Sequence, residues 1–137
     1  MTSFVLDNSV AMRWCFESGA HPYADSVLNR LATGDTAFVP VLWLYEASAV
    51  LSRAQNTGTL AAPKAAEFIT ELRSLNIIAD DAGVARVLTD VHRLALSHHL
   101  TSYDAAYLEL AIRLNLPLAT LDDKLIRAAR AAGVAVL

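Results

Sequence analysis

Two kinds of hydrophobic pattern alternate along the chain. Short unbroken apolar runs, bounded by polar residues, glycine or proline, are typical of strands buried on both faces of a parallel sheet. The first run ends abruptly at Asp7, and the second is stopped by Pro40. The predicted strands lie at 3–6, 36–39, 76–79, 117–119 and 134–137.

The segments between the strands carry apolar residues three and four positions apart, which is the spacing of one helix face. Pro63 lies in the first turn of one segment, and Gly133 follows the end of another. Asp80 with Asp81, and Ser102, are interpreted as caps. The predicted helices lie at 10–16, 23–31, 41–54, 64–75, 82–97, 103–114 and 124–132. Strands that alternate with helices predict a parallel sheet with helices on both faces.

The composition favours one folded domain over 1–137, because 55% of the 137 residues are hydrophobic. No apolar run is long enough to span a bilayer, and no basic region precedes the first strand, so we expect a cytoplasmic protein without a signal peptide. Cys15 is the only cysteine, which excludes an internal disulfide. The net charge of −3 gives no overall attraction to nucleic acid, although a local basic rim or a bound cation can supply it.

Acidic residues follow several of the predicted strands. Asp7 ends the first strand, Glu46 lies in the first two turns of the helix after the second, and Asp122 follows the fourth. Strand ends and the starts of the following helices share one edge of a doubly wound sheet, where ligands bind. Topology therefore places these three carboxylates at one edge, and Asp104 joins them if its helix begins at that edge.

Each acid also has a purely structural interpretation. Asp7, Asp104 and Asp122 lie where helices begin, and a carboxylate near the positive end of a helix dipole contributes about 0.3–1 kcal/mol. Glu46 is harder to explain in this way, because its neighbours are mostly apolar and the nearest base in the sequence is Arg53, two turns away. A buried carboxylate needs a partner, since unpaired buried charge is costly.

Carboxylates that converge must be neutralised. Two unit charges at about 4 Å repel by about 4 kcal/mol at an effective dielectric constant of 20. Either some of the acids take up protons or a cation lies among them. Carboxylate and water oxygens, without histidine or cysteine, suit Mg²⁺ or Mn²⁺, which activate water and stabilise charge on a phosphoryl oxygen. The predicted donor set therefore favours phosphodiester hydrolysis.

Four stretches of the chain resemble one known family. They follow one another in the family's order over nearly the whole chain, and the third is the most specific. The stretches are 5–10 (VLDNSV), 40–46 (PVLWLYE), 100–108 (LTSYDAAYL) and 119–125 (ATLDDKL). On these residues the sequence resembles PIN-domain proteins, and specifically the VapC toxins of bacterial type II toxin–antitoxin pairs.

The resemblance implies a fold, an activity and partners. The implied fold is a PIN-like three-layer α/β/α domain with a central parallel sheet of four or five strands. The implied activity is that of a Mg²⁺- or Mn²⁺-dependent endoribonuclease, neutralised by a VapB-like antitoxin encoded beside it. A homodimer is also implied, and the Ala- and Leu-rich composition indicates an apolar partner surface.

The resemblance also assigns roles to individual residues. The implied acidic quartet, which holds the metal and activates the attacking water, is Asp7, Glu46, Asp104 and Asp122. Ser9 and Thr120 match the family's hydroxyls near the first and the last acid. Asn8 stands where the family often has a smaller residue. Asp123 competes for the last acidic position, but spacing favours Asp122 as the ligand and Asp123 as a supporting or capping group.

Other classes of protein stay open as alternatives. A haloacid-dehalogenase-type phosphatase would use Asp7 as its nucleophile, but its usual second Asp is Ser9 here. A response-regulator receiver would need an acidic pair before its phosphorylated Asp and a lysine after a late strand, which Lys124 matches poorly. The same fold also serves non-toxin nucleases in RNA processing and non-catalytic partner-binding domains, and the complete acidic set argues against the latter.

Basic and aromatic residues near the predicted rim have two interpretations each. Arg13, Lys124 and Arg127 are candidates for contacts with RNA phosphates, although a solvated face is the commoner role of such residues. Trp14 and Trp43 are candidates for base stacking, but we expect them to pack in the core or at a dimer interface.

Two further features are interpreted as structural. The adjacent His98 and His99 suggest a transition-metal site, but neighbouring side chains point apart on most backbones, so we interpret them as part of a loop. Tyr107 lies one turn after Asp104, and we expect it to support that carboxylate.

Overall fold

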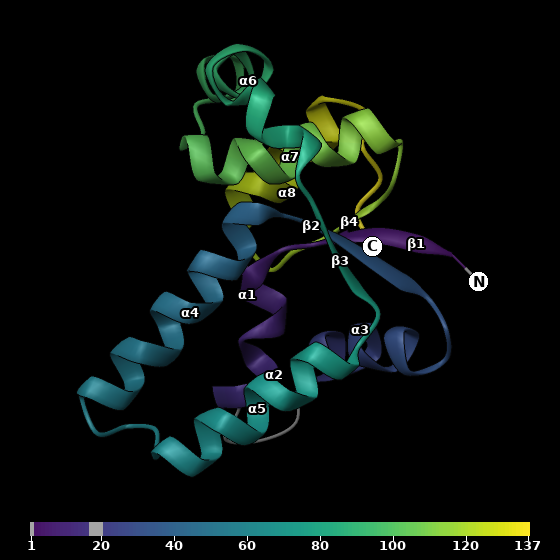
Figure 1. Ribbon diagram of the computed structural model, residues 1–137. Helices are drawn as coiled ribbons and strands as arrows, with labels where there is room; N and C mark the ends of the chain where they lie inside the picture. The colour runs from purple at the N-terminus through teal and green to yellow at the C-terminus, as the bar shows by residue number, and fades with distance from the viewer. Residues whose placement is uncertain (1, 17–20) are drawn as a thin grey trace.

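The centre of the molecule is a parallel four-stranded sheet in the order β3-β2-β1-β4 (Figure 1). The computed structural model describes residues 2–16 and 21–137. Its strands are β1 (Ser3–Leu6), β2 (Thr36–Pro40), β3 (Ile77–Asp80) and β4 (Leu118–Ala119). β1 pairs with β2 on one side and with β4 on the other. The strand order therefore reverses at β1, and such a switch point is where open α/β sheets place their ligands.

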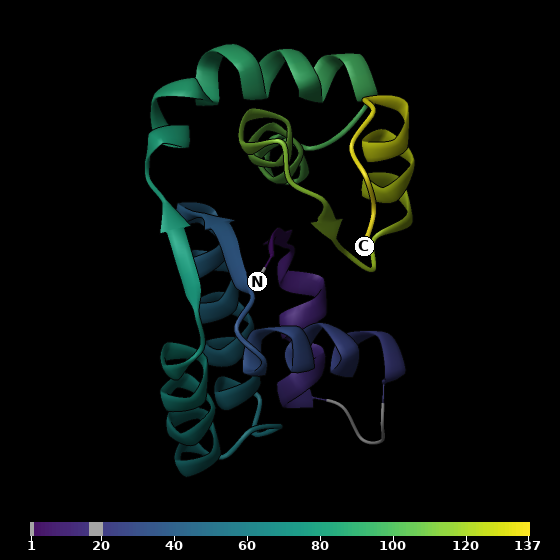
Figure 2. The ribbon, with the colours of Figure 1, turned by 90° about the vertical axis from the view of Figure 1, so that its right-hand side faces the viewer.

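Helices cover the sheet on both sides, which gives three layers. In chain order they are α1 (Asn8–Ala11), α2 (Arg13–Phe16), α3 (Pro22–Ala32), α4 (Val41–Asn56), α5 (Ala62–Ser74), α6 (His92–His98), α7 (Ser102–Leu114) and α8 (Asp123–Ala131). Figures 1 and 2 show α6, α7 and α8 on one side of the sheet and α1 to α5 on the other. α4 and α5 form a hairpin that projects away from the sheet. The predicted α/β/α arrangement is confirmed.

The core is built around β1. Phe4, Val5 and Leu6 have no exposed surface, because helices pack on both faces of this strand. Val27 of α3 and Leu108 of α7 belong to the same buried cluster. Each such side chain contributes about 1.5–3 kcal/mol when it is fully buried. The unbroken apolar run that predicted β1 is therefore explained by burial on both faces, and the burial fixes where Asp7 leaves the sheet.

The segment predicted as one α-helix at 82–97 is a series of shorter helical pieces. A 3₁₀-helix covers Ala82–Arg86, a π-helix covers Val87–Val91, and α6 follows. Of the predicted caps, Asp80 Oδ2 accepts a hydrogen bond from the backbone N–H of Gly83 at 3.1 Å, whereas the Asp81 side chain caps no described backbone N–H. Most apolar residues of the segment lie at the surface: Val84 is 61% exposed and Leu88 is 87% exposed. Because so few of them are buried, core packing does not impose regular α-helical geometry here.

Other predicted boundaries also differ from the structure. The N-cap of α7 is Thr101 rather than Ser102: the Thr101 backbone is extended, and its Oγ1 accepts a hydrogen bond from the backbone N–H of Asp104 at 3.1 Å. The predicted last strand forms one isolated bridge, between Val136 and Leu118, beside the four-stranded sheet.

The N-terminal helical region was predicted at 10–16 with a break at 19–22. The structure divides it into α1 and α2 at Met12. Residues 19 and 20 of the break lie outside the described residues, and α3 begins at Pro22. Among the helices that the structure describes, none has both the length and the apolar character that a membrane crossing requires.

Candidate active site

The acids predicted to converge come from different elements and reach one edge of the sheet. Asp7 follows β1 as the N-cap of α1, and Glu46 lies in the second turn of α4. Asp104 is in the first turn of α7, and Asp122 is the N-cap of α8. Figure 1 shows that α1 and α4 begin where β1 and β2 end, and that α7 begins on the same side. The position of Asp104, which topology alone left open, is near this edge, because the charges of Asp122 and Asp7 act on it.

The carboxylates lie close enough to perturb one another's pKa. Burial is the main cause that raises the pKa of Asp7, of Glu46 and of Asp104. The charge of Asp122 adds to the rise at Asp7 and at Asp104. The charges of Asp7 and Asp104 add to the rise at Glu46. Four acids distant in sequence thus share one electrostatic environment.

Asp7 is the most buried member of this set, with 6% of its surface exposed. Its Oδ2 accepts hydrogen bonds from Ser9 Oγ and from Thr120 Oγ1, each at 2.7 Å. Both bonds favour the charged carboxylate and oppose the rise that burial causes in its pKa. The two hydroxyls that the family resemblance singled out therefore both contact the first acid.

The same hydroxyls attach the loop after β4 to the end of β1. Ser9 Oγ accepts a hydrogen bond from the backbone N–H of Leu121 at 3.1 Å. Thr120 Oγ1 accepts one from the backbone N–H of Asp122 at 3.0 Å. The backbone N–H of Asp7 also donates to the carbonyl of Ala119 at 2.9 Å. This network fixes the position of Asp122 relative to Asp7, although the two residues lie near opposite ends of the chain.

Glu46 is paired with a tyrosine, which corrects the expectation for Tyr107. Tyr107 is fully buried, and its hydroxyl donates to Glu46 Oε1 at 2.5 Å rather than supporting Asp104. Burial and the neighbouring Glu46 raise the pKa of Tyr107, so the phenol stays protonated and acts as the donor. A buried tyrosine hydroxyl needs a partner. The sequence carries no signal that links Tyr107 to Glu46, because the two residues are separated by 61 positions.

Asp122 has a capping role in addition to its place in the acidic set. Its Oδ1 accepts hydrogen bonds from the backbone N–H groups of Lys124 at 2.9 Å and Leu125 at 3.2 Å. The cap of α8 is therefore Asp122 and not Asp123, whose side chain is exposed in the first helical turn. Because both cap bonds use Oδ1, the capping and metal-binding interpretations of Asp122 are compatible.

The chemistry of this donor set fits a divalent metal ion. It consists of oxygen ligands, which Mg²⁺ and Mn²⁺ prefer. Within residues 2–16 and 21–137, no three His, Cys, Asp or Glu side chains are grouped closely enough to hold an ion directly. An ion at this edge would therefore need water among its ligands, and Mg²⁺ usually keeps several of its waters. Asn8 lies beside Asp7, and its buried Oδ1 has no hydrogen-bond partner in the described part of the chain.

Sequence reasoning missed a second group of charges, at the end of β3. Arg113 Nη2 lies 2.6 Å from Asp80 Oδ2, and Arg113 Nε lies 2.8 Å from Glu109 Oε2. The Glu109–Arg113 spacing of four residues on one helix was an available signal. The cluster joins β3 to α7, and α7 carries Asp104 and Tyr107. It therefore helps to hold two residues of the candidate site in place.

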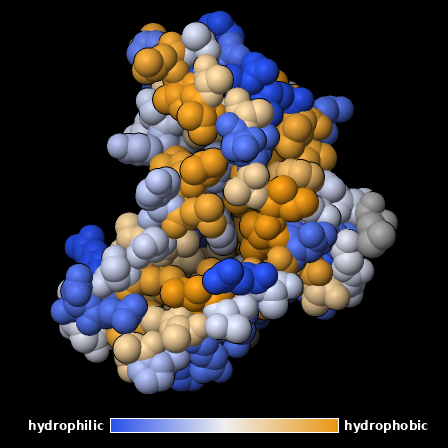
Figure 3. All heavy atoms as spheres, in the orientation of Figure 1, coloured by the Kyte–Doolittle hydropathy of each residue, from blue (hydrophilic) through white to orange (hydrophobic). Residues whose placement is uncertain are grey.

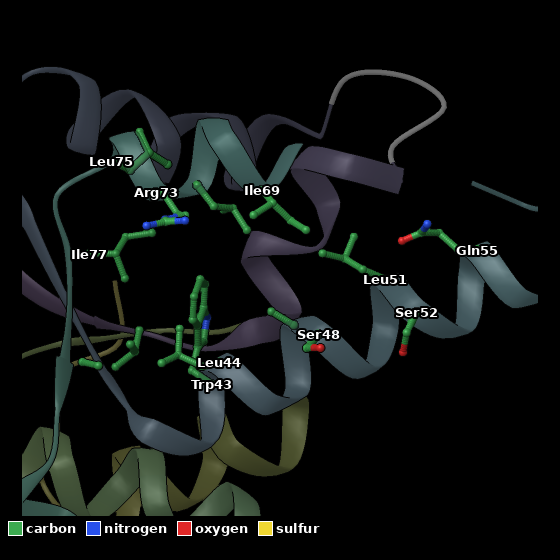
Figure 4. Close-up of a pocket in the computed structure, with 14 residues that line it drawn as sticks. Trp43, Leu44, Ser48, Leu51, Ser52, Gln55, Ile69, Arg73, Leu75 and Ile77 are labelled. Carbon is green, nitrogen blue, oxygen red and sulfur yellow. The ribbon is translucent and has the colours of Figure 1, made fainter. Parts of the chain in front are cut away.

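An apolar groove lies apart from the acidic edge, between α4, α5 and the sheet. Its volume is about 480 Å³. Figure 3 shows apolar side chains gathered around a hollow on this face, and Figure 4 shows Trp43, Leu51, Ile69 and Ile77 directed toward it. Trp43 is 3% exposed, and Trp14 donates its indole N–H to a backbone carbonyl at 2.9 Å. Both tryptophans are packed into the structure, as expected.

The family of the chain follows from a comparison with known sequence families. The PIN domain profile matches residues 4–131, which include all four acids, and the chain belongs to the PIN domain family. PIN domains are nucleases, and they generally use divalent metal ions. A search of curated proteins found no match.

Several solved structures share the fold. VapBC2 from Rickettsia felis, bound to a DNA fragment from its promoter, aligns with a TM-score of 0.71 and 16% identity over 100% of this chain and 98% of that chain. PAE2754 from Pyrobaculum aerophilum aligns with a TM-score of 0.69 and 22% identity over 93% of this chain and 79% of that chain. FitAcB from Neisseria gonorrhoeae aligns with a TM-score of 0.65 and 18% identity over 100% of this chain and 96% of that chain. At these identities the similarity shows a common fold.

Proposed function

We propose that residues 1–137 form a Mg²⁺- or Mn²⁺-dependent endoribonuclease, the toxin of a VapBC-like pair that acts in the cytoplasm. The observation that carries this proposal is the convergence of four acids at the switch point of a PIN-domain sheet. Each acid either has a raised pKa or raises the pKa of a neighbour, and a bound dication would relieve this repulsion. The residues are Asp7, Glu46, Asp104 and Asp122.

In this proposal Asp7, Asp104 and Asp122 hold the metal, partly through water. When bound, the ion supplies a more acidic coordinated water and stabilises negative charge on the phosphoryl oxygens. Ser9 and Thr120 hold the Asp7 carboxylate in one orientation through their hydrogen bonds to Oδ2. A carboxylate fixed in this way is better placed than a freely rotating one to bind a cation that has strict geometry.

Glu46 is the proposed general base. Its raised pKa brings it closer to the range in which a carboxylate can take a proton from water at neutral pH. Tyr107 orients it by donating to Oε1, which leaves Oε2 to face the attacking water. The water oxygen bonds to phosphorus in line, the bond to the 3′-oxygen breaks, and that oxygen takes up a proton. The products are a 5′-phosphate and a 3′-hydroxyl, so the preference for RNA must come from binding.

We further propose an antitoxin-type partner and a homodimer. One solved structure with the same fold is a toxin–antitoxin complex from Klebsiella pneumoniae, with a TM-score of 0.59 and 18% identity. Exposed apolar side chains on α4 and α6 support a partner surface: Leu44 is 51% exposed, Tyr45 72% and Leu96 67%.

The test is RNA cleavage by the wild type and by Asp7→Asn. We expect the substitution to abolish cleavage of a mixed RNA substrate while circular dichroism shows an intact fold, and we expect EDTA to stop the wild type. Asp81→Asn is the matched control, because Asp81 is an exposed acid at the same edge of the sheet. Cleavage by Asp7→Asn at the rate of the wild type, or full activity in EDTA, would contradict the proposal.

A further inference from the structure

A second cavity near the acidic edge is lined by basic side chains. It lies between the end of α6 and α8, which Figure 2 shows beside each other, and has a volume of about 370 Å³. The residues that line it are His98, His99, Lys124, Arg127, Ala128 and Ala131. We call this cavity the basic groove. None of the described residues that line it is acidic, although the chain as a whole has a net charge of −3.

The sequence of α8 explains why the groove is open and basic. Lys124, Arg127, Ala128 and Ala131 are spaced three, four and seven residues from the first, so they share one face of the helix. The two alanines leave space between the longer basic side chains. The adjoining face is anchored in the core by Leu125, which has no exposed surface, and Ala128 at the base of the groove is 5% exposed. The groove is therefore the outer face of a firmly packed helix.

The other wall of the groove is the C-terminal end of α6. His99 ends α6 in the left-handed region, with φ of 54°. Helices commonly end in a left-handed residue, and histidine is among the residues other than glycine that are enriched in this region. In this conformation His98 and His99 both line the groove, whereas the sequence alone suggested that adjacent histidines point apart.

The basic groove adjoins the acidic site through Lys124. The backbone N–H of Lys124 donates to Asp122 Oδ1 at 2.9 Å. The Lys124 charge also acts on Asp104, whose pKa it lowers against the larger effects of burial and neighbouring acids. A ligand that reaches from the acidic site along α8 therefore passes directly into the groove.

The cations of the groove are available for an external anion. Arg30, Arg86 and Arg113 each form an ion pair with a carboxylate elsewhere in the molecule. Neither Lys124 nor Arg127 makes an ion pair within the part of the chain that the structure describes. The two cations lie on adjacent turns of α8, with the two histidines beside them. This arrangement complements the negative charge of a phosphate and would not favour an apolar ligand.

We propose that the basic groove binds a backbone phosphate of the RNA strand, next to the phosphate that is cleaved at the acidic site. This inference rests on the proposed nuclease function. Four acids at the reaction site repel a polyanion, so the affinity for RNA must come from cations beside them. Phosphate contacts position the strand without reading its sequence, so the groove contributes affinity and register rather than base specificity.

The test is RNA binding by Arg127→Gln and by the double variant that also carries Lys124→Gln. Binding of a short fluorescein-labelled single-stranded RNA is followed by anisotropy in EDTA, over a range of salt concentrations. We expect Arg127→Gln to weaken binding about five- to tenfold for all RNA sequences, and to reduce the slope of log affinity against log salt by about 0.7 for each phosphate that is no longer bound. Arg130→Gln removes the same charge from the same helix outside the groove, and should leave both quantities unchanged.

Steady-state kinetics in Mg²⁺ separate this proposal from the nuclease proposal. We expect the groove variants to raise KM about tenfold while kcat stays within about twofold of the wild type. If the groove variants bind RNA with the affinity and the salt slope of the wild type, the groove proposal is overturned and the nuclease function stays intact. Binding of an acidic peptide to the groove would not change that conclusion. Weakened RNA binding by the variants, together with a wild type that fails to cleave RNA, would support the groove and overturn the nuclease function.

Discussion

Replacing Asp7 by asparagine should stabilise the metal-free protein at neutral pH, although it removes a carboxylate that the proposed reaction needs. Asp7 is 6% exposed, and its pKa is raised by burial first and then by the charge of Asp122. A carboxyl group whose pKa is higher in the folded state binds its proton more tightly there. Its charged form therefore opposes folding, and asparagine fills the same volume without that charge.

The size of the effect follows from two opposing contributions. Ser9 and Thr120 each hydrogen-bond Asp7 Oδ2 at 2.7 Å, and replacing the charged acceptor by a neutral one loses about 2 kcal/mol in total. In the other direction, burial is the largest single cause and raises the pKa of Asp7, and the charge of Asp122 adds a smaller rise than either hydrogen bond offsets. Since the net pKa shift is upward, burial and repulsion outweigh the hydrogen bonds. We expect a gain of about 1 kcal/mol, or about 3–5 °C in Tm.

The assay is urea unfolding of the wild type and Asp7→Asn in EDTA at several pH values. The wild type loses stability as the pH rises from the unfolded to the folded pKa of Asp7, so the advantage of Asp7→Asn should be largest near neutral pH and should vanish in acid. Asp81→Asn, which removes an exposed acid, should unfold like the wild type at each pH. A wild type more stable than Asp7→Asn at neutral pH, or an advantage that grows in acid, would refute the electrostatic reasoning.

Further substitutions test the contacts around the site. Tyr107→Phe keeps the ring and removes the hydroxyl that donates to Glu46, so it should lower the free energy of unfolding by about 1–2 kcal/mol and slow RNA cleavage. An unfolding free energy and a cleavage rate equal to those of the wild type would show that this hydrogen bond is unimportant. Thr120→Val removes a hydroxyl that contacts Asp7 and should weaken metal affinity about 10–100-fold by calorimetry, whereas Thr120→Ser should retain it; equal losses would contradict the role of the hydroxyl. Arg113→Met leaves two largely buried carboxylates without their cation and should lower the free energy of unfolding by about 3 kcal/mol in urea; a loss below about 1 kcal/mol would indicate a solvent-screened pair.

The parts of the fold that the sequence predicted are those that depend on local pattern. β1 was recognisable because three adjacent side chains are buried on alternating faces. Asp7 and Asp122 were placed correctly at the sheet edge, because each directly follows a strand and precedes a helix. The prediction of one α-helix at 82–97 was wrong for the converse reason. The apolar residues of this segment recur at helical spacing but are mostly exposed, so their pattern did not indicate a buried helix face.

The contacts that the sequence did not predict join residues far apart in the chain. Glu46 and Tyr107 are separated by 61 residues, and Asp80 and Arg113 by 33. Each residue has several plausible partners when it is considered alone, and only the packing of α7 against the sheet selects one. The cap of α7 illustrates a smaller ambiguity, because Thr101 and Ser102 are both good caps and the extended backbone at Thr101 decides between them.

The most direct test of the proposed metal site is calorimetric titration of the protein with Mn²⁺. We expect the wild type to bind the ion, Asp7→Asn and Asp104→Asn to bind it at least about tenfold more weakly, and Asp81→Asn to match the wild type. Equal Mn²⁺ affinity in all four proteins, or no binding by the wild type, would mean that the acids at this edge do not hold a metal.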